Sequence, residues 1–169
     1  MTRSLARPVD APVPPASVRA EAASEALHGR LHGTWRLVSF TQTLLATGET
    51  VDVFGTSPTG FINYGPDGRM MVLMVKDERP SPSGLSKITD EERAELFRTM
   101  VAYAGTYEVG DGTVTHHLDI SWNQVFTGTD QVRNIALDGR KLVMSTNPQP
   151  RSQDGQVAVS VLTFEWITP

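Results

Sequence analysis

The fold is decided by the stretch TGFINYGPDGRMMVLMVK, residues 59–76, which reads as a β-hairpin. Its two strands are Thr59–Tyr64 and Arg69–Lys76, and the turn Gly65-Pro66-Asp67-Gly68 lies between them. An Asp-Gly pair adopts positive φ angles at little cost, as a tight hairpin turn requires. The stretch therefore predicts two neighbouring antiparallel strands.

Further strands lie on both sides of this hairpin. They are predicted at Thr34–Thr43, Thr106–Val109, Thr113–Ser121, Gln131–Leu137, Lys141–Thr146 and Val157–Ile167. The chain is thus expected to be all-β, with about eight antiparallel strands that close into an up-and-down barrel, because closure leaves no exposed sheet edge. A barrel of about eight strands has room inside for side chains or for one small ligand.

One α-helix is predicted within this series of strands, capping an end of the barrel. Thr89-Asp90-Glu91-Glu92 has the spacing of a capping box, in which the first and last residues bond to each other's backbone amides. Apolar residues then recur on one helical face from Leu96 to Ala104. We expect a helix near residues 90–103 that stops close to Gly105.

The N-terminal part of the chain differs in composition from the rest. Residues 1–15 contain four of the eleven prolines, which disfavour regular structure. Residues 17–31 are rich in Ala and Glu and could form a short helix across one mouth of the barrel, or a solvated leader. We therefore expect a disordered or partly helical leader over residues 1–30, followed by one barrel domain over residues 31–169.

Composition and charge argue against several classes of function. Hydrophobic residues make up 39% of the 169 residues and charged residues 20%, which is ordinary for a soluble globular protein. The formal net charge is −4 and no basic block occurs, so no nucleic-acid partner is expected. No apolar run approaches the roughly 18 residues of a membrane span, so no membrane partner is expected either. The absence of cysteine fits a cytoplasmic location.

His116 and His117 are the most conspicuous polar pair. Neighbours in a strand face opposite sides, so His116 shares a face with the apolar Val114, Leu118 and Ile120. If this face is the interior, His116 is a buried imidazole with a lowered pKa, neutral near pH 7, and is our first candidate catalytic residue. The alternatives are a purely structural histidine and the inverted facing, which would bring His117 inside.

Arg133 is the second candidate catalytic residue. It alternates with Ile135 and Leu137 along a predicted strand. If that face points inward, the guanidinium would bind a carboxylate or enolate oxygen in the cavity through two hydrogen bonds. If it points outward, Arg133 is a solvated residue of the sheet surface.

A set of large apolar side chains is expected to contact a ligand. These residues are Phe61, Tyr64, Met71, Leu73, Tyr103, Tyr107, Leu118, Trp122 and Trp166. Together they could form an adaptable apolar pocket. The alternative for each of them is ordinary core packing.

No metal site and no cofactor are predicted. His28 and His32 have the spacing of a helical zinc pair, but neither a cysteine nor an HExxH motif accompanies them. No Gly-Lys-Ser/Thr loop is present to hold a nucleotide, and no GxSxG sequence marks a hydrolase nucleophile.

Five segments carry a resemblance to a known family. They are GTWRLVSF (33–40), TGFINYGPDGRMMV (59–72), YAGTYEV (103–109), THHLDIS (115–121) and GTDQVRNIALDGRKLVMST (128–146). In this order and spacing they resemble the lipocalin-like domain family of bacteria and fungi, over roughly residues 31–167. An Arg commonly follows the last-strand Trp in such domains, where a cation–aromatic contact would close the barrel base, whereas here Ile167 follows Trp166.

The resemblance implies a calycin-type barrel and two classes of function. Similar barrels carry apolar molecules, and some small barrels in natural-product pathways act as cyclases. We expect a barrel that encloses an apolar small molecule, either as a cofactor-independent cyclase or isomerase of polyketide-type biosynthesis or as a non-catalytic carrier or sequestering protein. A barrel filled by its own side chains is the third reading. The expected partner is that ligand, and the protein is expected to be a monomer or a homodimer.

Overall fold

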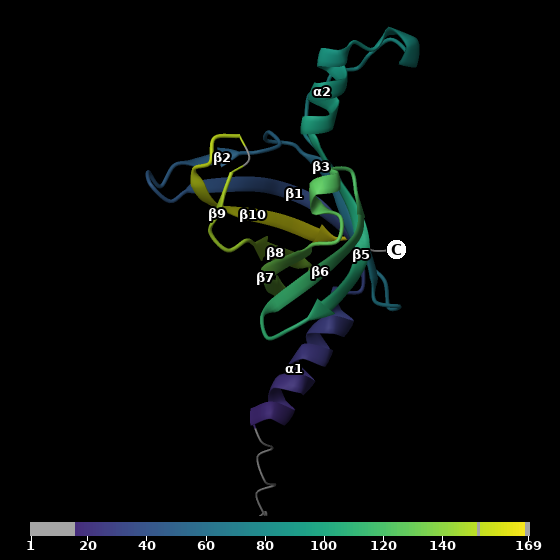
Figure 1. Ribbon diagram of the computed structural model, residues 1–169. Coiled ribbons are helices and arrows are strands. Elements are labelled where there is room, and N and C mark those ends of the chain that lie inside the picture. The colour runs from purple at the N-terminus through teal and green to yellow at the C-terminus, as the bar shows by residue number, and fades with distance from the viewer. Residues whose placement is uncertain (1–15, 152, 168–169) are drawn as a thin grey trace, which may run out of the picture.

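The strands close into one antiparallel β-barrel (Figure 1). The computed structural model describes residues 16–151 and 153–167. The eight barrel strands are β1 (Gly33–Leu44), β3 (Thr59–Tyr64), β4 (Arg69–Val75), β5 (Met100–Val109), β6 (Thr113–Ser121), β7 (Asp130–Asp138), β8 (Lys141–Ser145) and β10 (Val157–Trp166). Pairing of β1 with β10, from Trp35 opposite Trp166 to Leu44 opposite Ala158, closes the sheet. The predicted all-β, eight-stranded barrel is confirmed.

Two short strands lie at the rim of the barrel. Strand β2 (Thr50–Asp52) pairs with β1, and β9 (Gln149–Pro150) pairs with β10. Neither is among the strands predicted from the sequence, because two or three residues are too few to show an alternating pattern. Both pair at the far end of β1 and β10 from Trp35 and Trp166.

The β3–β4 hairpin has the turn that its sequence predicts. The Gly65 amide donates to the Arg69 carbonyl at 2.7 Å, and Gly68 has a φ angle of 77°. The shorter turn between β7 and β8 also has a glycine at positive φ, Gly139 at 55°. Both glycines occupy the left-handed region, which side chains with a Cβ rarely adopt.

Helix α2 (Asp90–Arg98) begins as predicted and ends earlier. Thr89 Oγ1 accepts from the Glu92 amide at 3.2 Å, and Glu92 Oε2 accepts from the Thr89 amide at 2.9 Å, which completes the capping box. The prediction of a helix as far as residue 103 is wrong, because residues 100–103 begin β5 and pair with β4. Within the described ranges, no helix is long and apolar enough to cross a membrane.

The closed end of the barrel is covered by the C-terminal part of α1 (Ala16–Leu31) rather than by α2. Leu31 is fully buried, and its carbonyl accepts the indole N–H of Trp35 at 2.8 Å. Figure 1 shows α2 standing off from the opposite end, and α2 buries none of its residues. Of the two readings for residues 17–31, the structure therefore shows a helix, and its C-terminal part packs on the barrel. The part of the expected leader up to residue 15 lies outside the described residues.

Side chains alternate between the two faces of each strand, with one interruption in β6. His116 and Leu118 are buried, as the period-two pattern predicts, whereas Ile120 is 64% exposed. Gly105 lies opposite Leu118, and its neighbour in β5 lies opposite Ile120, so Asp119 is an extra residue in a β-bulge. One extra residue moves every following side chain to the other face. The expectation that Ile120 shares the face of His116 is therefore wrong.

Gly105 allows this bulge to form. A Cβ at this position would lie 1.8 Å from the carbonyl oxygen of His117 on the neighbouring strand. The obstructing atom belongs to the backbone, so it cannot move away as the end of a flexible side chain would. The close approach of β5 and β6 thus requires a residue without a side chain.

The base of the barrel has a cation–aromatic contact after all. The guanidinium carbon of Arg140, in the turn between β7 and β8, lies 5.5 Å from the ring centroid of Trp166. Its Nη2 also donates to the Trp166 carbonyl at 2.9 Å. An arginine from another turn therefore supplies the positive charge that residue 167 lacks.

Candidate functional site

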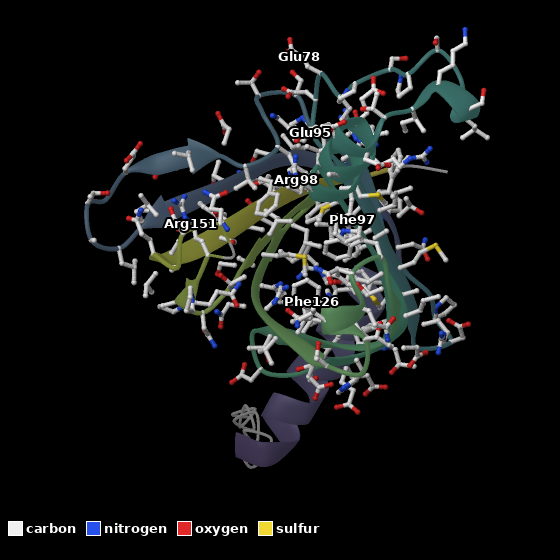
Figure 2. All side chains as sticks on the ribbon, turned by 45° about the horizontal axis from the view of Figure 1, so that its top comes forward. Glu78, Glu95, Phe97, Arg98, Phe126 and Arg151 are labelled. Atoms are coloured by element: carbon white, nitrogen blue, oxygen red, sulfur yellow. The ribbon has the colours of Figure 1, made fainter. Side chains whose placement is uncertain are left out.

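The barrel encloses a cavity of about 630 Å³ that opens at the end opposite α1. Small-molecule sites usually have volumes of roughly 300–1,000 Å³. Figure 2 looks toward the open end, where Phe97 and Arg98 of α2, Phe126 of η2 (Gln124–Phe126) and Arg151 contribute to the lining. The space therefore fits one small molecule entering between these rim residues.

Most of the cavity wall is apolar. Its apolar residues are Phe40, Val53, Phe54, Ile62, Val72, Met74, Phe97, Met100, Val101, Leu118, Trp122, Phe126, Met144, Pro150, Leu162 and Phe164. Aromatic rings supply large contact areas, and methionine side chains adapt to irregular shapes. Such a wall favours an apolar ligand over a strongly hydrated one.

Arginines are the charged residues of this wall within the described part of the chain. They are Arg98, Arg133 and Arg151. Arg98 pairs with Glu95 at 3.1 Å, and Arg151 pairs with Asp154. Arg133 makes no ion pair with any residue that the structure describes. The cavity therefore contains one guanidinium whose charge no described carboxylate balances.

Arg133 is held in place by neutral acceptors. Its Nη2 donates to Gln131 Oε1 at 3.2 Å, and its Nη1 donates to the Val132 carbonyl at 2.9 Å. The amide nitrogen of Gln131 donates to Thr129 Oγ1 at 3.1 Å, which turns the Gln131 oxygen toward Arg133. Of the two placements open for Arg133, the structure shows the inward one. An unbalanced guanidinium in apolar surroundings attracts an anionic oxygen.

His116 lies at the inner part of the cavity and is 1% exposed. Its Nε2 is 2.7 Å from the Tyr64 hydroxyl, and its Nδ1 is 3.2 Å from the Tyr103 hydroxyl. Burial lowers the pKa of His116 to about 3, and the positive charges of Arg133 and His117 act in the same direction. The imidazole is therefore neutral near pH 7, with one nitrogen as donor and the other as acceptor.

Both hydroxyl groups beside His116 stay protonated near neutral pH. Burial raises the pKa of Tyr64 well above its usual range, and burial also raises the pKa of Tyr103. The charge of Arg133 opposes this shift in both cases. Tyr64, His116 and Tyr103 thus form a chain of three uncharged groups, whose chemistry is hydrogen-bond donation rather than proton removal.

His117 faces outward, so the inverted facing considered for this strand is excluded. Its Nδ1 lies 2.7 Å from Asp130 Oδ1 on β7, and its side chain is 34% exposed. The hydrogen bond to Asp130 raises the pKa of His117, against a smaller effect of desolvation. The two adjacent histidines therefore have pKa values displaced in opposite directions from the usual value.

Four of the residues expected to contact a ligand lie at or near the cavity. Tyr103, Leu118 and Trp122 line its wall. Tyr64 is fully buried and contacts the wall through His116. These residues come from three different strands and the segment after β6, and the barrel brings them together.

Phe61, Met71 and Leu73 do not line the cavity, and their expected role as ligand contacts is corrected. They lie on the outer face and are 43%, 61% and 52% exposed. Strand β4 is apolar on both faces, so its pattern contains no signal for which face is inward. In the structure Met70 and every second residue after it in β4 are buried.

Tyr107 and Trp166 are also corrected, because both lie at the closed end. The Tyr107 hydroxyl donates to the Gly65 carbonyl at 3.0 Å, and its ring stacks on His28 with centroids 5.2 Å apart. Trp166 packs against the core next to the start of β1. For these two residues the alternative reading, ordinary packing, is the one observed.

Some wall residues were missed by reasoning from the sequence. Gln131 lies two residues before Arg133 on the same face, so the period of two could have identified it. Gln42 and Ser160 face each other across β1 and β10, with a 3.1 Å hydrogen bond between their side chains. Phe126 reaches the wall from a short 3-10 helix, and no local pattern marks such a contact.

No cluster of three or more His, Cys, Asp or Glu side chains suited to a metal ion occurs in the residues described. His28 and His32 contact each other edge to face, with ring centroids 4.7 Å apart, at the closed end near Tyr107. Neither ring lines the cavity.

Comparison with known proteins identifies the family of this chain. No curated protein matches the sequence closely enough to count as a relative. The model of the lipocalin-like domain matches residues 32–167, which covers most of the chain and every strand of the barrel. The chain therefore belongs to the lipocalin-like domain family.

Proposed function

We propose that this protein binds one apolar small molecule inside the barrel. The observation that supports this most directly is the cavity of about 630 Å³ with its largely apolar wall and its opening at one end. Membership in the lipocalin-like family fits the binding of small hydrophobic ligands. Burying the apolar surface of such a ligand contributes about 25 cal/mol per Å² removed from water, which favours entry into the cavity.

A fluorescent apolar dye tests this proposal. N-phenyl-1-naphthylamine is uncharged and brightens when it leaves water, so its titration reports binding directly. The blocking variant is Leu118→Trp, which adds volume to the cavity wall. The matched control is Ile120→Trp, two residues along the same strand but on the outer face, where the side chain is already exposed.

We expect Leu118→Trp to weaken dye binding about tenfold or more, which corresponds to about 1.4 kcal/mol. Ile120→Trp should bind the dye as the unmodified protein does. Val101→Trp, at a half-buried position of the same wall, serves as a second blocking variant if Leu118→Trp unfolds. Equal binding by the blocking and control variants would show that the dye sits outside the barrel and would refute the proposal.

A second candidate function is cofactor-independent cyclisation of the bound molecule. Tyr103 and Arg133 both present hydrogen-bond donors to the cavity, so they could polarise a carbonyl group while the wall holds a flexible chain near its reactive shape. The low pKa of His116 makes its imidazole a weak base, and the raised pKa values of the tyrosines keep their hydroxyl groups protonated near neutral pH. They therefore support cyclisation by polarisation more than isomerisation that begins with proton removal.

Citronellal separates a cyclase from a carrier. It is a flexible, apolar aldehyde that isomerises to a cyclic alcohol when its carbonyl is polarised, with no other reactant and no atom lost. Displacement of the naphthylamine dye would show that citronellal binds, and gas chromatography would show whether it is converted. Conversion that disappears in Tyr103→Phe supports the cyclase, whereas binding without conversion supports a carrier.

A further inference from the structure

We infer that the inner part of the cavity is an oxyanion site, which takes the negatively charged oxygen of an otherwise apolar ligand. Arg133 supplies the opposite charge, and the Tyr103 hydroxyl supplies a hydrogen bond. His116 and Gln131 are positioning residues for these two groups. The inference rests on the proposed function, because it assigns a ligand class to the same cavity.

The first step is the charge of the cavity wall. Arg98 and Arg151 at the rim are each neutralised by a carboxylate close to them in the chain. Arg133 is bound only to an amide oxygen and a backbone carbonyl among the described residues. Two of its five N–H donors are used in these bonds, so others remain for a ligand. A half-buried cation with free donors is best satisfied by an anionic oxygen.

The second step is the direction of the hydrogen bonds around His116. Tyr64 is fully buried, and the other acceptor near its hydroxyl is the Met144 sulfur at 4.0 Å, which is a weak one. The 2.7 Å contact with His116 Nε2 therefore takes the Tyr64 proton. The imidazole is neutral, so its single N–H lies on Nδ1 and donates to the Tyr103 oxygen at 3.2 Å.

The third step is the direction in which the Tyr103 hydroxyl donates its proton. Its oxygen accepts from His116, so its own proton is free to be donated elsewhere. Tyr103 lines the cavity, and its partner His116 lies opposite Gln131, whose side chain accepts from the Arg133 guanidinium. A hydroxyl that already accepts one hydrogen bond is a stronger donor for the next. Tyr103 and Arg133 therefore converge on the same part of the cavity.

The ligand class is thus a phenolate, an enolate or a carboxylate on an apolar frame. The three share one feature, an anionic oxygen that can accept from both a guanidinium and a hydroxyl. An apolar alcohol or hydrocarbon of the same shape leaves Arg133 desolvated without an anion, which is unfavourable. The site consequently discriminates by charge as well as by shape.

Three coumarins of nearly equal shape test this inference. They are 7-hydroxy-4-methylcoumarin, which ionises to a phenolate, 7-methoxycoumarin-4-acetate, which is a carboxylate, and 7-methoxy-4-methylcoumarin, which is neutral. The absorption spectrum of the hydroxycoumarin reports directly whether the bound phenol is ionised. We expect bound hydroxycoumarin to ionise at a pH at least about one unit lower than in solution, a tenfold preference for the anion.

Arg133→Met should remove the preference for the anion and weaken both anionic probes about tenfold or more. The neutral methoxycoumarin should bind at least as tightly as before, because no guanidinium is then desolvated by it. Arg133→Lys, which keeps the charge but not the planar fork, should retain part of the preference. Arg36→Met is the matched control, because Arg36 lies on the outside in an ion pair with Glu165 and should have no effect.

Tyr103→Phe should reduce the preference for the phenolate by a smaller factor of about three to ten. Tyr64→Phe tests the positioning role, since it leaves both ligand-facing groups in place and removes only the far end of the chain through His116. A shift in the ionisation of the bound phenol without loss of methoxycoumarin binding supports that role.

Two results would overturn the inference in distinguishable ways. If the three coumarins bind equally and the bound phenol ionises as it does in solution, there is no oxyanion site, although the proposal of an apolar ligand stands. If neither the neutral coumarin nor the naphthylamine dye binds, the proposed function fails, and the oxyanion site fails with it.

Discussion

Lowering the pH should destabilise this protein through His116 in particular, by an amount that the structure allows us to estimate. The imidazole has a pKa of about 3 in the folded protein and about 6.5 when exposed, because burial disfavours its charged form. Between these two values the unfolded chain binds a proton that the folded protein does not. The contribution of His116 to stability is therefore fully present above the unfolded pKa of about 6.5, and it is lost as the pH falls below that value.

The expected magnitude follows from the width of this interval. Each pH unit below the unfolded pKa costs the folded state about 1.4 kcal/mol until the folded pKa is reached. At about pH 5 the loss from His116 alone is thus roughly 2 kcal/mol relative to neutral pH. This is a large part of the total stability of an ordinary domain, about 5–15 kcal/mol.

The assay compares the unmodified protein with His116→Gln, which cannot titrate. Urea unfolding at neutral pH and at about pH 5 gives the free energy of unfolding of each protein, and the carboxylates titrate equally in both. The advantage of the unmodified protein over the variant should shrink by roughly 2 kcal/mol on acidification. NMR signals of the His116 ring should show no titration until the pH is far below 6.5.

His117→Gln is the matched control and should show the opposite sign. Asp130 raises the pKa of His117, so its contribution to stability is present below the unfolded pKa and is lost as the pH rises through the folded pKa. The reasoning about burial would be refuted by a His116 ring that titrates near 6.5 in the folded protein, or by identical pH slopes for the unmodified protein and His116→Gln.

Three further changes test the fold. Gly105→Ala places a Cβ 1.8 Å from the carbonyl oxygen of His117, so we expect a loss of at least about 3 kcal/mol in urea unfolding, and a loss below about 1 kcal/mol would contradict the bulge geometry. Leu31→Ala removes a fully buried side chain and should cost about 2–5 kcal/mol, whereas Leu85→Ala, at a residue 92% exposed, should change stability by less than about 0.5 kcal/mol. Similar losses of stability in the two variants would show that α1 does not pack as described. Thr89→Ala removes a helix cap that contributes about 0.5–2 kcal/mol, so amide hydrogen exchange should become faster within α2 but not within the barrel strands. Unchanged exchange in α2 would contradict the capping box.

Local chemistry accounts for the parts of the fold that were predictable. The turn at Gly65–Gly68 and the cap at Thr89 each involve residues within a few positions of one another, so their preferences are visible in the sequence. The alternating burial of β6 up to Leu118 was visible for the same reason. The end of α2 was not, because residues 100–103 suit a helix locally and become a strand only by pairing with β4.

Which face of each strand points into the barrel is decided only when the barrel closes. Strand β4 is apolar on both sides, so nothing within it shows that Met71 and Leu73 face outward. The bulge that turns Ile120 outward is a property of two strands together, and it depends on the close contact of Gly105 with the strand opposite.

The candidate site likewise has features that the sequence predicts and features that only the folded barrel determines. The residue types and the period of two were enough to single out His116 and Arg133 and to predict a container for an apolar molecule. The proton state of His116 depends on Tyr64, which is 52 residues away in the chain, and the unbalanced charge of Arg133 depends on which side chains reach it across the cavity. Periodicity and turn preference are properties of short segments, whereas burial, charge balance and hydrogen-bond direction arise only when distant strands enclose a common space.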